Sequence, residues 1–328
     1  MHISQKSDRI CIMKRAFFLF LSILLLNVYS PLSLAARQLK VGLLNGPSAV
    51  PAAYLIEHKS DFKSAELDFQ IFPGADLELP KLLKGELDIA VLPPNAAAKV
   101  WNKSNNDIIT LAVIGEGNIS LLTTDQNYNG LKTLAGKKVY CAGRGATPEY
   151  VFKHIISEME IQNIILDFSI PNPELAGSLI SGKAEYIVVP EPFATFALMK
   201  GKEAGVRKLF NLSDFINENF PVTVLVCNKK SLNKPETKKS IMEYLSVYKK
   251  AVKWTNANPS EAGALVEKHT LGLNAAIAAA SIPEGHYVFI PAKDARKKIE
   301  NLLSLFIKEN PEYIGGKMPD ENFYYNGK

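Results

Sequence analysis

The sequence lacks most of the patterns that mark enzymes and metalloproteins. It has three cysteines in 328 residues and five dispersed histidines, with no HExxH pattern and no Cys/His cluster at metal-ligand spacing. Ser48 lies in "GPSAV", which does not have the second glycine of a nucleophile elbow. These absences argue against a metalloenzyme or a serine hydrolase. We expect no catalytic residues, no metal and no cofactor.

The longest apolar run is short and lies near the N-terminus, and no long run follows it. Lys14-Arg15 precede "AFFLFLSILLLNV" (16–28), and Ser33-Leu34-Ala35 provide a small-residue cleavage site. This run of 13 residues is shorter than the about 20 that a transmembrane helix needs. No cysteine follows it directly, so a lipid anchor is not expected. The sequence predicts a signal peptide over 1–35 and a soluble periplasmic protein.

Charge of one sign is not in excess once the leader is removed. Residues 1–35 hold four basic residues and one acidic residue, so 34 basic and 32 acidic residues remain from totals of 38 and 33. This balance does not favour nucleic acid as a partner. Cys141 and Cys227 each end a β-like run, and an exported protein can form disulfides, so the sequence leaves open whether they are free.

The chain repeats one pattern. "KGELDIAVLPPNAAAKVW" (84–101) and "SGKAEYIVVPEPFATFAL" (181–198) match at an offset of 97 residues. Each is preceded by a strand, a glycine-containing turn and a helical run, at 38–59 and 136–157, with an offset of 98. The sequence therefore predicts two equivalent structural units.

Each unit alternates strands with helices. The first is expected at 39–44, 48–58, 66–72, 76–84, 88–92 and 94–103, and the second at 137–141, 147–160, 164–169, 173–181, 185–189 and 191–200. This alternation indicates two α/β lobes with parallel sheets. Further strands are expected at 107–114, 118–124 and 221–228, with 117–124 and 221–228 crossing between the lobes. A helical C-terminal third returns to the first lobe, so lobe 1 comprises 36–116 and 229–328 and lobe 2 comprises 117–228.

A binding site is expected where the parallel strands end, because ligands of open α/β sheets lie at the carboxyl ends of the strands. Four such segments are "NGPSA" (45–49), "PPNAA" (93–97), "GRGATP" (143–148) and "PEPFA" (190–194). The candidate ligand-binding residues in and beside them are Asn45, Gly46, Ser48, Ala49, Pro94, Asn95, Asn118, Arg144, Gly145, Ala146, Thr147 and Glu191.

Five of these candidates have both a chemical reason and a purely structural alternative. Ser48 and Thr147 suit helix N-caps whose free N–H groups face the ligand, and Arg144 suits a carboxylate or an oxyanion. Asn95 offers a donor and an acceptor, and Glu191 suits an amine or a ring N–H. The alternatives are simple capping, turn formation and a solvated arginine. Phe193, Tyr150 and Trp101 are candidate cleft aromatics, but aromatic residues at helical spacing are more often core residues.

"AGRGATPE" also resembles a dinucleotide-binding fingerprint, since it follows a strand and opens a helix. Pro148 occupies the position of the third glycine, and an exported protein meets little free cofactor. A helix N-terminus that binds a polar group accounts for the same residues.

Several segments together resemble one known family: "LKVGLLNGPSAVPAAYLIE", "GELDIAVLPPNAAAKVWNK", "GATPEYVFKHIISE", "VVPEPFATFALMK" and "NPEYIGGKMPDENFYY". They are similar to substrate-binding proteins of ABC importers, in the nitrate/sulfonate/taurine and thiamine-precursor (SsuA/NMT1-like) branch. The resemblance covers essentially the whole chain after the leader. It implies a type II periplasmic-binding-protein fold, in which a monomer closes around a small polar or anionic organic solute and delivers it to a membrane permease.

Two other classes remain open. The fold also carries enzymes of the thiamine-pyrimidine and menaquinone-pathway types, but the former use a cysteine-rich motif and an internal histidine substrate, and the latter are cytosolic. A non-transporting sensor or adhesin module is the third class. Within the transporter class, a sulfonate would face Glu191 with like charge, so the residues favour a heterocyclic solute of the thiamine-precursor type.

Overall fold

The computed structural model describes residues 37–46, 48–216 and 219–327. The leader expected at 1–35 lies outside the described residues. The unit that begins at Gln38 holds two β-sheets, each with its own helices.

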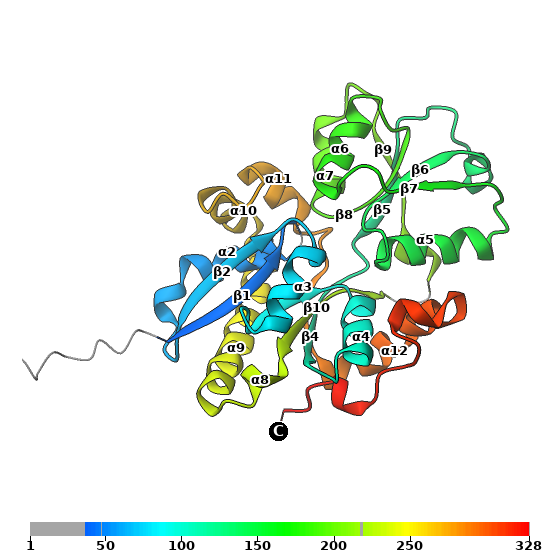
Figure 1. Cartoon of the computed structure of the whole chain (residues 1–328). Helices are drawn as coiled ribbons and strands as arrows, with labels where there is room; N and C mark the ends of the chain where they lie inside the picture. The colour runs from blue at the N-terminus through cyan, green and yellow to red at the C-terminus, as the bar shows by residue number, and fades with distance from the viewer. Residues whose placement is uncertain (1–36, 47, 217–218, 328) are drawn as a thin grey trace, which may run out of the picture. The chain divides into compact units, whose positions relative to one another are not determined.

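The larger sheet, of lobe 1, has six strands in the order β11-β4-β10-β3-β1-β2 (Figure 1). They are β1 (Gln38–Leu44), β2 (Glu66–Phe72), β3 (Ile89–Leu92), β4 (Ile108–Glu116), β10 (Pro221–Asn228) and β11 (Tyr287–Pro291). β1 is parallel to β2 and β3, whereas β10 is antiparallel to both β3 and β4. Three strands from the first repeat thus form one half of the sheet.

The smaller sheet, of lobe 2, has five strands in the order β7-β6-β8-β5-β9. They are β5 (Ile119–Thr123), β6 (Lys138–Cys141), β7 (Ile165–Asp167), β8 (Tyr186–Pro190) and β9 (Arg207–Asn211). β6 is parallel to β7 and β8, and β5 pairs antiparallel with β8 and β9. The parallel order β2-β1-β3 of the first repeat recurs as β7-β6-β8, so the predicted duplication is confirmed.

Helices cover both faces of each sheet. Those of lobe 1 are α2 (Ala49–Glu57), α3 (Ala75–Lys84), α4 (Pro94–Lys103), α8 (Lys229–Leu232), α9 (Pro235–Ala257), α10 (Pro259–Lys268), α11 (Ala275–Ser281) and α12 (Ala292–Glu309). Those of lobe 2 are α5 (Thr147–Glu158), α6 (Asn172–Ile180) and α7 (Phe193–Lys200). Short 3₁₀ turns lie at η1 (Lys59–Asp61), η2 (Leu131–Leu134), η3 (Leu212–Phe215), η4 (Pro311–Ile314) and η5 (Glu321–Phe323).

The alternation of side chains along a strand explains the two covered faces. In β3, Ile89 and Val91 pack into the core that contains α2 and α9, whereas Ala90 and Leu92 pack into the core that contains α4 and α12. All four residues are fully buried. A strand buried on both faces reads as a continuous apolar run, as "IAVL" does.

Two adjacent backbone segments cross between the lobes. One runs from β4 to β5 through Gly117 and Asn118, and the other enters β10 through Phe220. The N–H of Gly117 donates to the carbonyl oxygen of Phe220 at 3.0 Å, so the two crossings are hydrogen-bonded to each other. This pair of crossings is the covalent link between the sheets.

The position of β10 differs from the prediction. Residues 221–228 were expected in lobe 2 as a crossing strand, but β10 lies in the larger sheet between β3 and β4. All eight of its residues are buried, because neighbouring strands flank both edges and helices cover both faces. Only its first residues adjoin the crossing, so the strand belongs to lobe 1.

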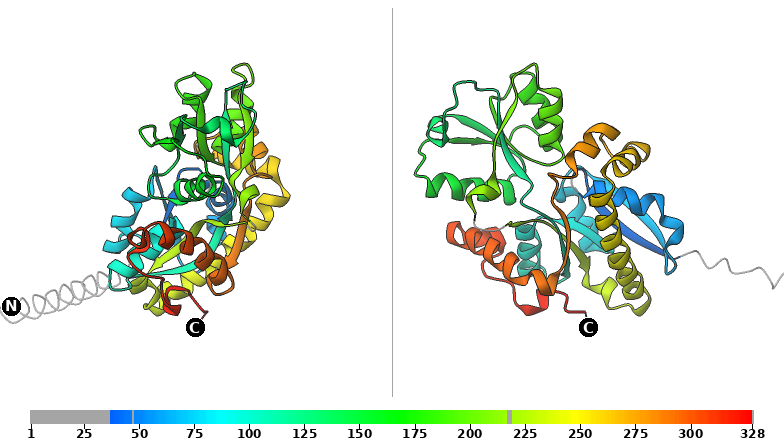
Figure 2. Two further views of the ribbon diagram at one scale, coloured as in Figure 1. Left: turned by 90° about the vertical axis from the view of Figure 1, so that its right-hand side faces the viewer. Right: turned by 180° about the vertical axis from the view of Figure 1, so that it is seen from behind.

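The C-terminal helix α12 contacts both lobes. It packs on β4 and α4 of lobe 1 and also on α5 of lobe 2, as Figures 1 and 2 show from opposite sides. The ring of Tyr150 on α5 lies 4.4 Å, centroid to centroid, from the rings of Phe306 and Tyr313. Lys153 on α5 also pairs with Glu309 on α12 at 3.3 Å. These contacts join the lobes away from the crossings.

Candidate functional site

Four strand ends form the candidate site. β1 ends at Leu44, β3 at Leu92, β6 at Cys141 and β8 at Pro190, and each is followed by a short turn and a helix. Because β1 and β3 are neighbours, and β6 and β8 are neighbours, each lobe presents two adjacent turns. The predicted site residues therefore lie at equivalent strand ends in the two lobes.

Direct contacts between the lobes close the site. The side-chain Nδ2 of Asn95, in lobe 1, donates to the carbonyl oxygen of Gly145, in lobe 2, at 2.6 Å. A Cβ atom placed on Gly46 would lie 3.0 Å from Cε2 of Phe193, so this turn of lobe 1 touches the first residue of α7. Gly46 also has φ +110°, which a side chain disfavours. Turns of both lobes thus meet at two points.

The crossing segment at Asn118 adjoins the same contacts. We call the residues around them, Ser48, Asn95, Asn118, Gly145, Thr147 and Glu191, the ring. The N–H of Glu191 donates to the carbonyl oxygen of Asn118 at 2.8 Å, because Asn118 extends the pairing of β5 with β8. The side-chain Nδ2 of Asn118 donates to the carbonyl oxygen of Gly285 at 3.1 Å. Asn118 therefore connects the end of β8 to the segment that precedes β11.

Polar residues of this ring are almost completely buried. The exposed fractions are 2% for Ser48, 3% for Asn95, 1% for Asn118, 0% for Thr147 and 2% for Glu191. Asn95 Oδ1, Asn118 Oδ1 and Thr147 Oγ1 have no hydrogen-bond partner among the described residues. A buried polar atom without a partner costs about 1–3 kcal/mol. A solute that pairs with these atoms would remove that cost.

Ser48 does not cap α2 as predicted. Its hydroxyl donates to the carbonyl oxygen of Leu44 at 2.7 Å and accepts from the N–H of Leu44 at 3.0 Å. The N-cap position of α2 has no side-chain hydrogen bond. The hydroxyl instead closes the turn at the end of β1, because the donor and the acceptor of Leu44 both lie within its reach. Ala49 begins the helix and is buried.

Thr147 also does not occupy the predicted N-cap. The helix α5 has Ala146 as its N-cap, and Thr147 is its first residue, with Pro148 in the first turn. The hydroxyl of Thr147 is therefore free of the capping role, which is consistent with its lack of a partner. Glu149 takes part in fixing the turn instead, since its Oε2 accepts from the N–H of Gly145 at 2.7 Å.

Arg144 lies outside the ring. Its side chain is exposed, and its guanidinium carbon is 4.7 Å from the centroid of the Phe168 ring. A cation over an aromatic face is a favourable contact in its own right. The structure thus gives Arg144 a surface partner, while the neighbouring Gly145 takes part in the ring through its backbone.

The remaining candidates occupy the expected strand ends. Asn45 is half-buried, and its N–H donates to the carbonyl oxygen of Phe72 at 2.8 Å. Pro94 is the first residue of α4 and is buried next to Asn95. The contacts of Asn45 and Pro94 do not indicate a role in ligand binding for either side chain.

The pKa of the Glu191 carboxyl group is higher than the ordinary value for glutamate. Burial raises the pKa of its carboxyl group to about 7, although the hydrogen bond from the N–H of Thr195, at 3.1 Å, opposes the shift. A substantial fraction of Glu191 is therefore protonated at neutral pH, and its carboxyl group can donate as well as accept a hydrogen bond.

The segment 284–286, just before β11, lies beside Asn118, and the sequence analysis did not identify it as part of the site. Glu284 pairs with Lys208 of β9 at 2.8 Å, which is a further contact between the lobes. The carbonyl oxygen of His286 accepts from the N–H of Glu116, and its Nδ1 has no partner among the described residues. The glycine in "PEGHYVF", which is followed by an apolar run, was the available signal for a turn into a strand.

Two of the three candidate aromatics are core residues. Trp101 and Tyr150 have exposed fractions of 2% and 4%, and they pack against Phe323 and Phe306, respectively. Phe193 alone contacts a turn of the site, through Gly46.

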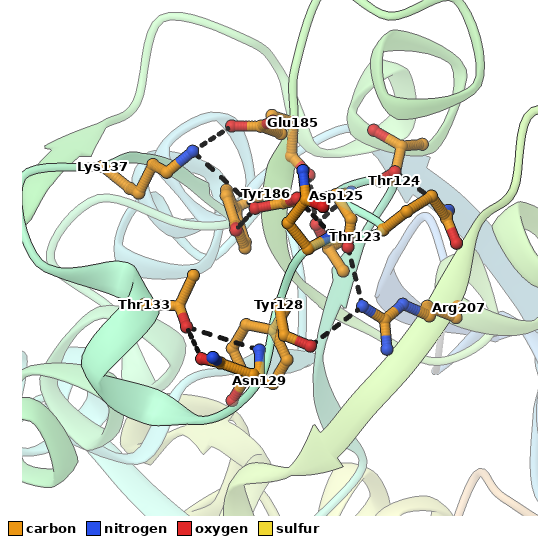
Figure 3. Close-up of polar contacts among 12 residues, drawn as sticks. Thr123, Thr124, Asp125, Tyr128, Asn129, Thr133, Lys137, Glu185, Tyr186 and Arg207 are labelled. Atoms are coloured by element: carbon orange, nitrogen blue, oxygen red, sulfur yellow. Dashed lines mark hydrogen bonds and ion pairs between the residues drawn. The ribbon is translucent and has the colours of Figure 1, made fainter.

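A second polar cluster lies at the opposite end of β8 from Glu191 (Figure 3). The hydroxyl of Tyr186 donates to the carboxylate of Asp125, and this bond lowers the pKa of Asp125. Lys137 pairs with Glu185 at 3.0 Å, and Arg207 donates to the carbonyl oxygen of Asp125 at 2.7 Å. The cluster fixes the loop after β5 and is separate from the ring.

Metal ligands, disulfides and membrane spans were also considered for the described part of the chain. It contains no group of three or more His, Cys, Asp or Glu side chains arranged to hold a metal ion. Cys141 and Cys227 are free and buried, in β6 and β10 of different sheets. Over the same residues, no helix has both the length and the apolar character that a membrane span requires.

The two similar α/β lobes and the paired crossings define the type II periplasmic-binding-protein fold. The solved structures that resemble this chain share this fold. An ABC transporter protein from Parabacteroides distasonis has a TM-score of 0.76 at 22% identity, over 89% of this chain and 100% of the other. The aliphatic sulphonate-binding protein SsuA of Escherichia coli gives 0.69 at 16% identity, over 90% and 95%.

A third similar structure is the nitrate-binding protein NrtA of Synechocystis PCC 6803. It has a TM-score of 0.68 at 11% identity, over 84% of this chain and 82% of the other. No protein of curated function matches by sequence. Residues 51–262, more than half of the chain, match the NMT1/THI5-like family, and the protein belongs to that family.

Proposed function

We propose that this protein is the solute-binding component of an ABC importer. It captures a small polar organic solute between its lobes and delivers it to a membrane permease. The observation that carries the proposal is the contact between the lobes at the strand ends: Asn95 of lobe 1 bonds to Gly145 of lobe 2, and the buried Asn95 Oδ1 and Thr147 Oγ1 have no hydrogen-bond partner among the described residues. Buried atoms of this kind, held by two bodies, suit a ligand that is bound by both.

Closure is the mechanism that the contacts support. A solute shifts the equilibrium between open and closed lobes only if it binds the closed form more tightly, which requires contact with both lobes. Thr147 and Glu191 come from lobe 2, Asn95 comes from lobe 1, and Asn118 lies at the crossing. A solute that touches these four residues would favour closure about the crossings.

Export and delivery complete the proposal. The leader-like sequence at 1–35 supports a periplasmic location. The names of the similar structures, an ABC transporter protein, a sulphonate-binding protein and a nitrate-binding protein, support a permease as the partner. A monomer as the working form is part of the proposal.

An enzyme is the second candidate, and the family name favours it, since the THI5-like proteins of the same family include enzymes. The described residues of the site offer carboxyl, amide, hydroxyl and imidazole groups, and the lysine beside them, Lys208, is paired with Glu284. The binding role therefore accounts for the site with fewer assumptions.

One set of experiments tests both candidates. The mature protein should begin near Ala35 and should be found in the periplasm. The solute that co-purifies with it should cause compaction in small-angle X-ray scattering when it is added back to the stripped protein. Mass spectrometry should recover that solute unchanged. Release of a chemically altered product would support the enzyme instead, and an unprocessed cytoplasmic protein would contradict the importer proposal.

A further inference from the structure

A small apolar hollow lies on the surface of lobe 1 and shares no residue with the ring. Its volume is about 180 Å³, and its apolar lining consists of Leu111 of β4, Leu245 of α9, Phe289 and Pro291 of β11, and Tyr325 near the C-terminus. Leu111 is 2% exposed and forms the floor, whereas the other four side chains are half-buried. Because the lining comes from lobe 1 alone, the shape of the hollow does not depend on the position of lobe 2.

The hollow arises where two segments share one edge of β4. β11 pairs with β4 as far as Ala112, and its last residue, Pro291, leads directly into α12. The C-terminal segment takes up the pairing at Thr110, whose carbonyl oxygen accepts from the N–H of Tyr325 at 2.9 Å. Leu111 lies between these two pairings, so the hollow is a gap left by the connection from β11 to α12.

Only lysines contribute charge to the lining. Lys249 of α9 and Lys293 of α12 both have exposed side chains, and neither takes part in an ion pair among the described residues. The adjacent Asp294 is exposed and is not part of the lining. An apolar floor with two unpaired cations at its rim is complementary to a molecule that has an apolar body and an anionic end.

The charge of the surrounding segment has the same sign. Residues 229–328, which include both lysines, hold 16 basic and 11 acidic residues, whereas residues 36–228 hold 18 and 21. The net positive charge of the protein after its leader therefore comes from the segment that carries α9 and α12. Attraction over a longer range thus also favours an anion at this surface.

The volume limits the ligand to one ring. An apolar protein cavity of about 150 Å³ binds one benzene molecule, and the hollow, at about 180 Å³, is slightly larger. Two of its walls, Phe289 and Tyr325, are aromatic and favour contact with another aromatic ring. A long acyl chain would leave most of its length in water, so a lipid does not fit.

We propose that this hollow is a second binding site, for a monocyclic aromatic carboxylate. The aromatic ring would cover Leu111, and the carboxylate would pair with Lys249 and Lys293 at the rim. The site goes beyond the proposed function, because it involves neither the ring residues nor lobe 2. Its ligand binds whether the lobes are open or closed and does not compete with the transported solute.

Three probes with the same ring and different charge test the ligand class. Benzoate, benzyl alcohol and benzylamine are titrated into the mature full-length protein, and binding is followed by saturation-transfer NMR. An exposed ion pair changes affinity by a factor of about 1.4 to 5, so benzoate should bind about fivefold more tightly than benzyl alcohol, and benzylamine should bind most weakly. The advantage of benzoate should shrink at high salt. Equal affinity for benzoate and benzylamine, or no saturable binding of benzoate, would overturn the proposal.

A pair of double variants tests the role of the two lysines. Lys249→Gln combined with Lys293→Gln should weaken benzoate binding about fivefold and leave benzyl alcohol unchanged. Lys250→Gln combined with Lys297→Gln is the matched control, because these lysines are exposed neighbours on the same helices that do not line the hollow. An equal loss in both double variants would contradict the proposal, since benzoate would then respond to the overall charge of lobe 1.

A further variant tests the position of the aromatic ring. Leu245→Trp places a larger side chain in the hollow and should abolish binding of both benzoate and benzyl alcohol. The lysine variants alter only exposed side chains, so they keep the test decisive if the tryptophan variant does not fold. Unchanged binding of benzoate to a folded Leu245→Trp variant would place the probe elsewhere and refute the site.

Discussion

Replacing Glu191 by glutamine should stabilise the solute-free protein at neutral and alkaline pH. Burial raises the pKa of Glu191 from its ordinary value of 4.5 to about 7. In the unfolded chain the carboxyl group loses its proton near 4.5, so between these two values the folded state binds more protons. The free energy of unfolding therefore falls as the pH rises through this window. Below pH 4.5 the burial of Glu191 costs little, and above pH 7 it costs the full amount.

The magnitude follows from the two pKa values. Each unit between the folded and the unfolded pKa corresponds to about 1.4 kcal/mol, so Glu191 should reduce the free energy of unfolding by about 3 kcal/mol at pH 8. Glutamine keeps an oxygen that can accept from the N–H of Thr195 and never ionises. The variant should therefore gain about 3 kcal/mol over the wild type at pH 8 and almost nothing at pH 4.

Urea unfolding of both proteins at several pH values between 4 and 8 measures this difference. Other groups that titrate in the window, including the buried Glu78, are present in both proteins and cancel when the two curves are subtracted. A difference that stays constant with pH would refute the reasoning, because it would mean that Glu191 ionises in the folded protein as readily as in the unfolded chain.

Three other variants test separate parts of the structure. Glu78→Gln should raise the free energy of unfolding by about 5 kcal/mol at pH 9 and little at pH 4.5, because burial raises the pKa of Glu78 to about 8, and urea curves that shift equally at both pH values would contradict this. Glu309→Gln removes the 3.3 Å ion pair with Lys153 across the lobes and leaves the 2.7 Å pair of Lys153 with Glu149 in place, and calorimetry should show solute binding weakened by up to about fivefold, more at low salt than at high salt. Glu300→Gln is its control, because the partner Arg296 lies on the same helix, and an equal effect there would exclude a role for the pair between lobes. Gly46→Ala should weaken solute binding by about tenfold, since the added methyl group meets Phe193 and the φ of +110° disfavours a side chain. Gly85→Ala imposes similar backbone strain at φ +74° with no atom within 4 Å, so it should lower stability without changing affinity.

The repeat explains why most of the fold could be predicted. β3 and β8 lie at the centre of their sheets and appear in the sequence as apolar runs that end at a proline, and both were located to within a residue. β9 was not recognised, because "RKLFN" is short, half-buried and contains two cations. β11 was not recognised either, since it is an edge strand between helices and only its first residue is fully buried. β2 and β7 are also edge strands but were located, because they lie within the repeated pattern, whereas β9 and β11 lie outside it.

The site was predictable as a set of segments and less so as a set of side chains. The strand-end rule correctly brought together the turns that contain Asn95, Thr147 and Glu191. It could not show that Arg144 turns outward, because its partner Phe168 is 24 positions further along the chain and follows another strand. Nor could it show that the hydroxyl of Ser48 turns back to Leu44, since capping and turn closure use the same residue types.

The placement of β10 has a consequence for the order in which the chain folds. β3 and β4 emerge early from the ribosome, but the strand that fills the space between them is synthesised more than a hundred residues later. Lobe 2 is continuous from β5 to β9, so it can assemble while lobe 1 still has two open strand edges. A nascent chain that has not reached residue 221 therefore cannot complete its larger sheet.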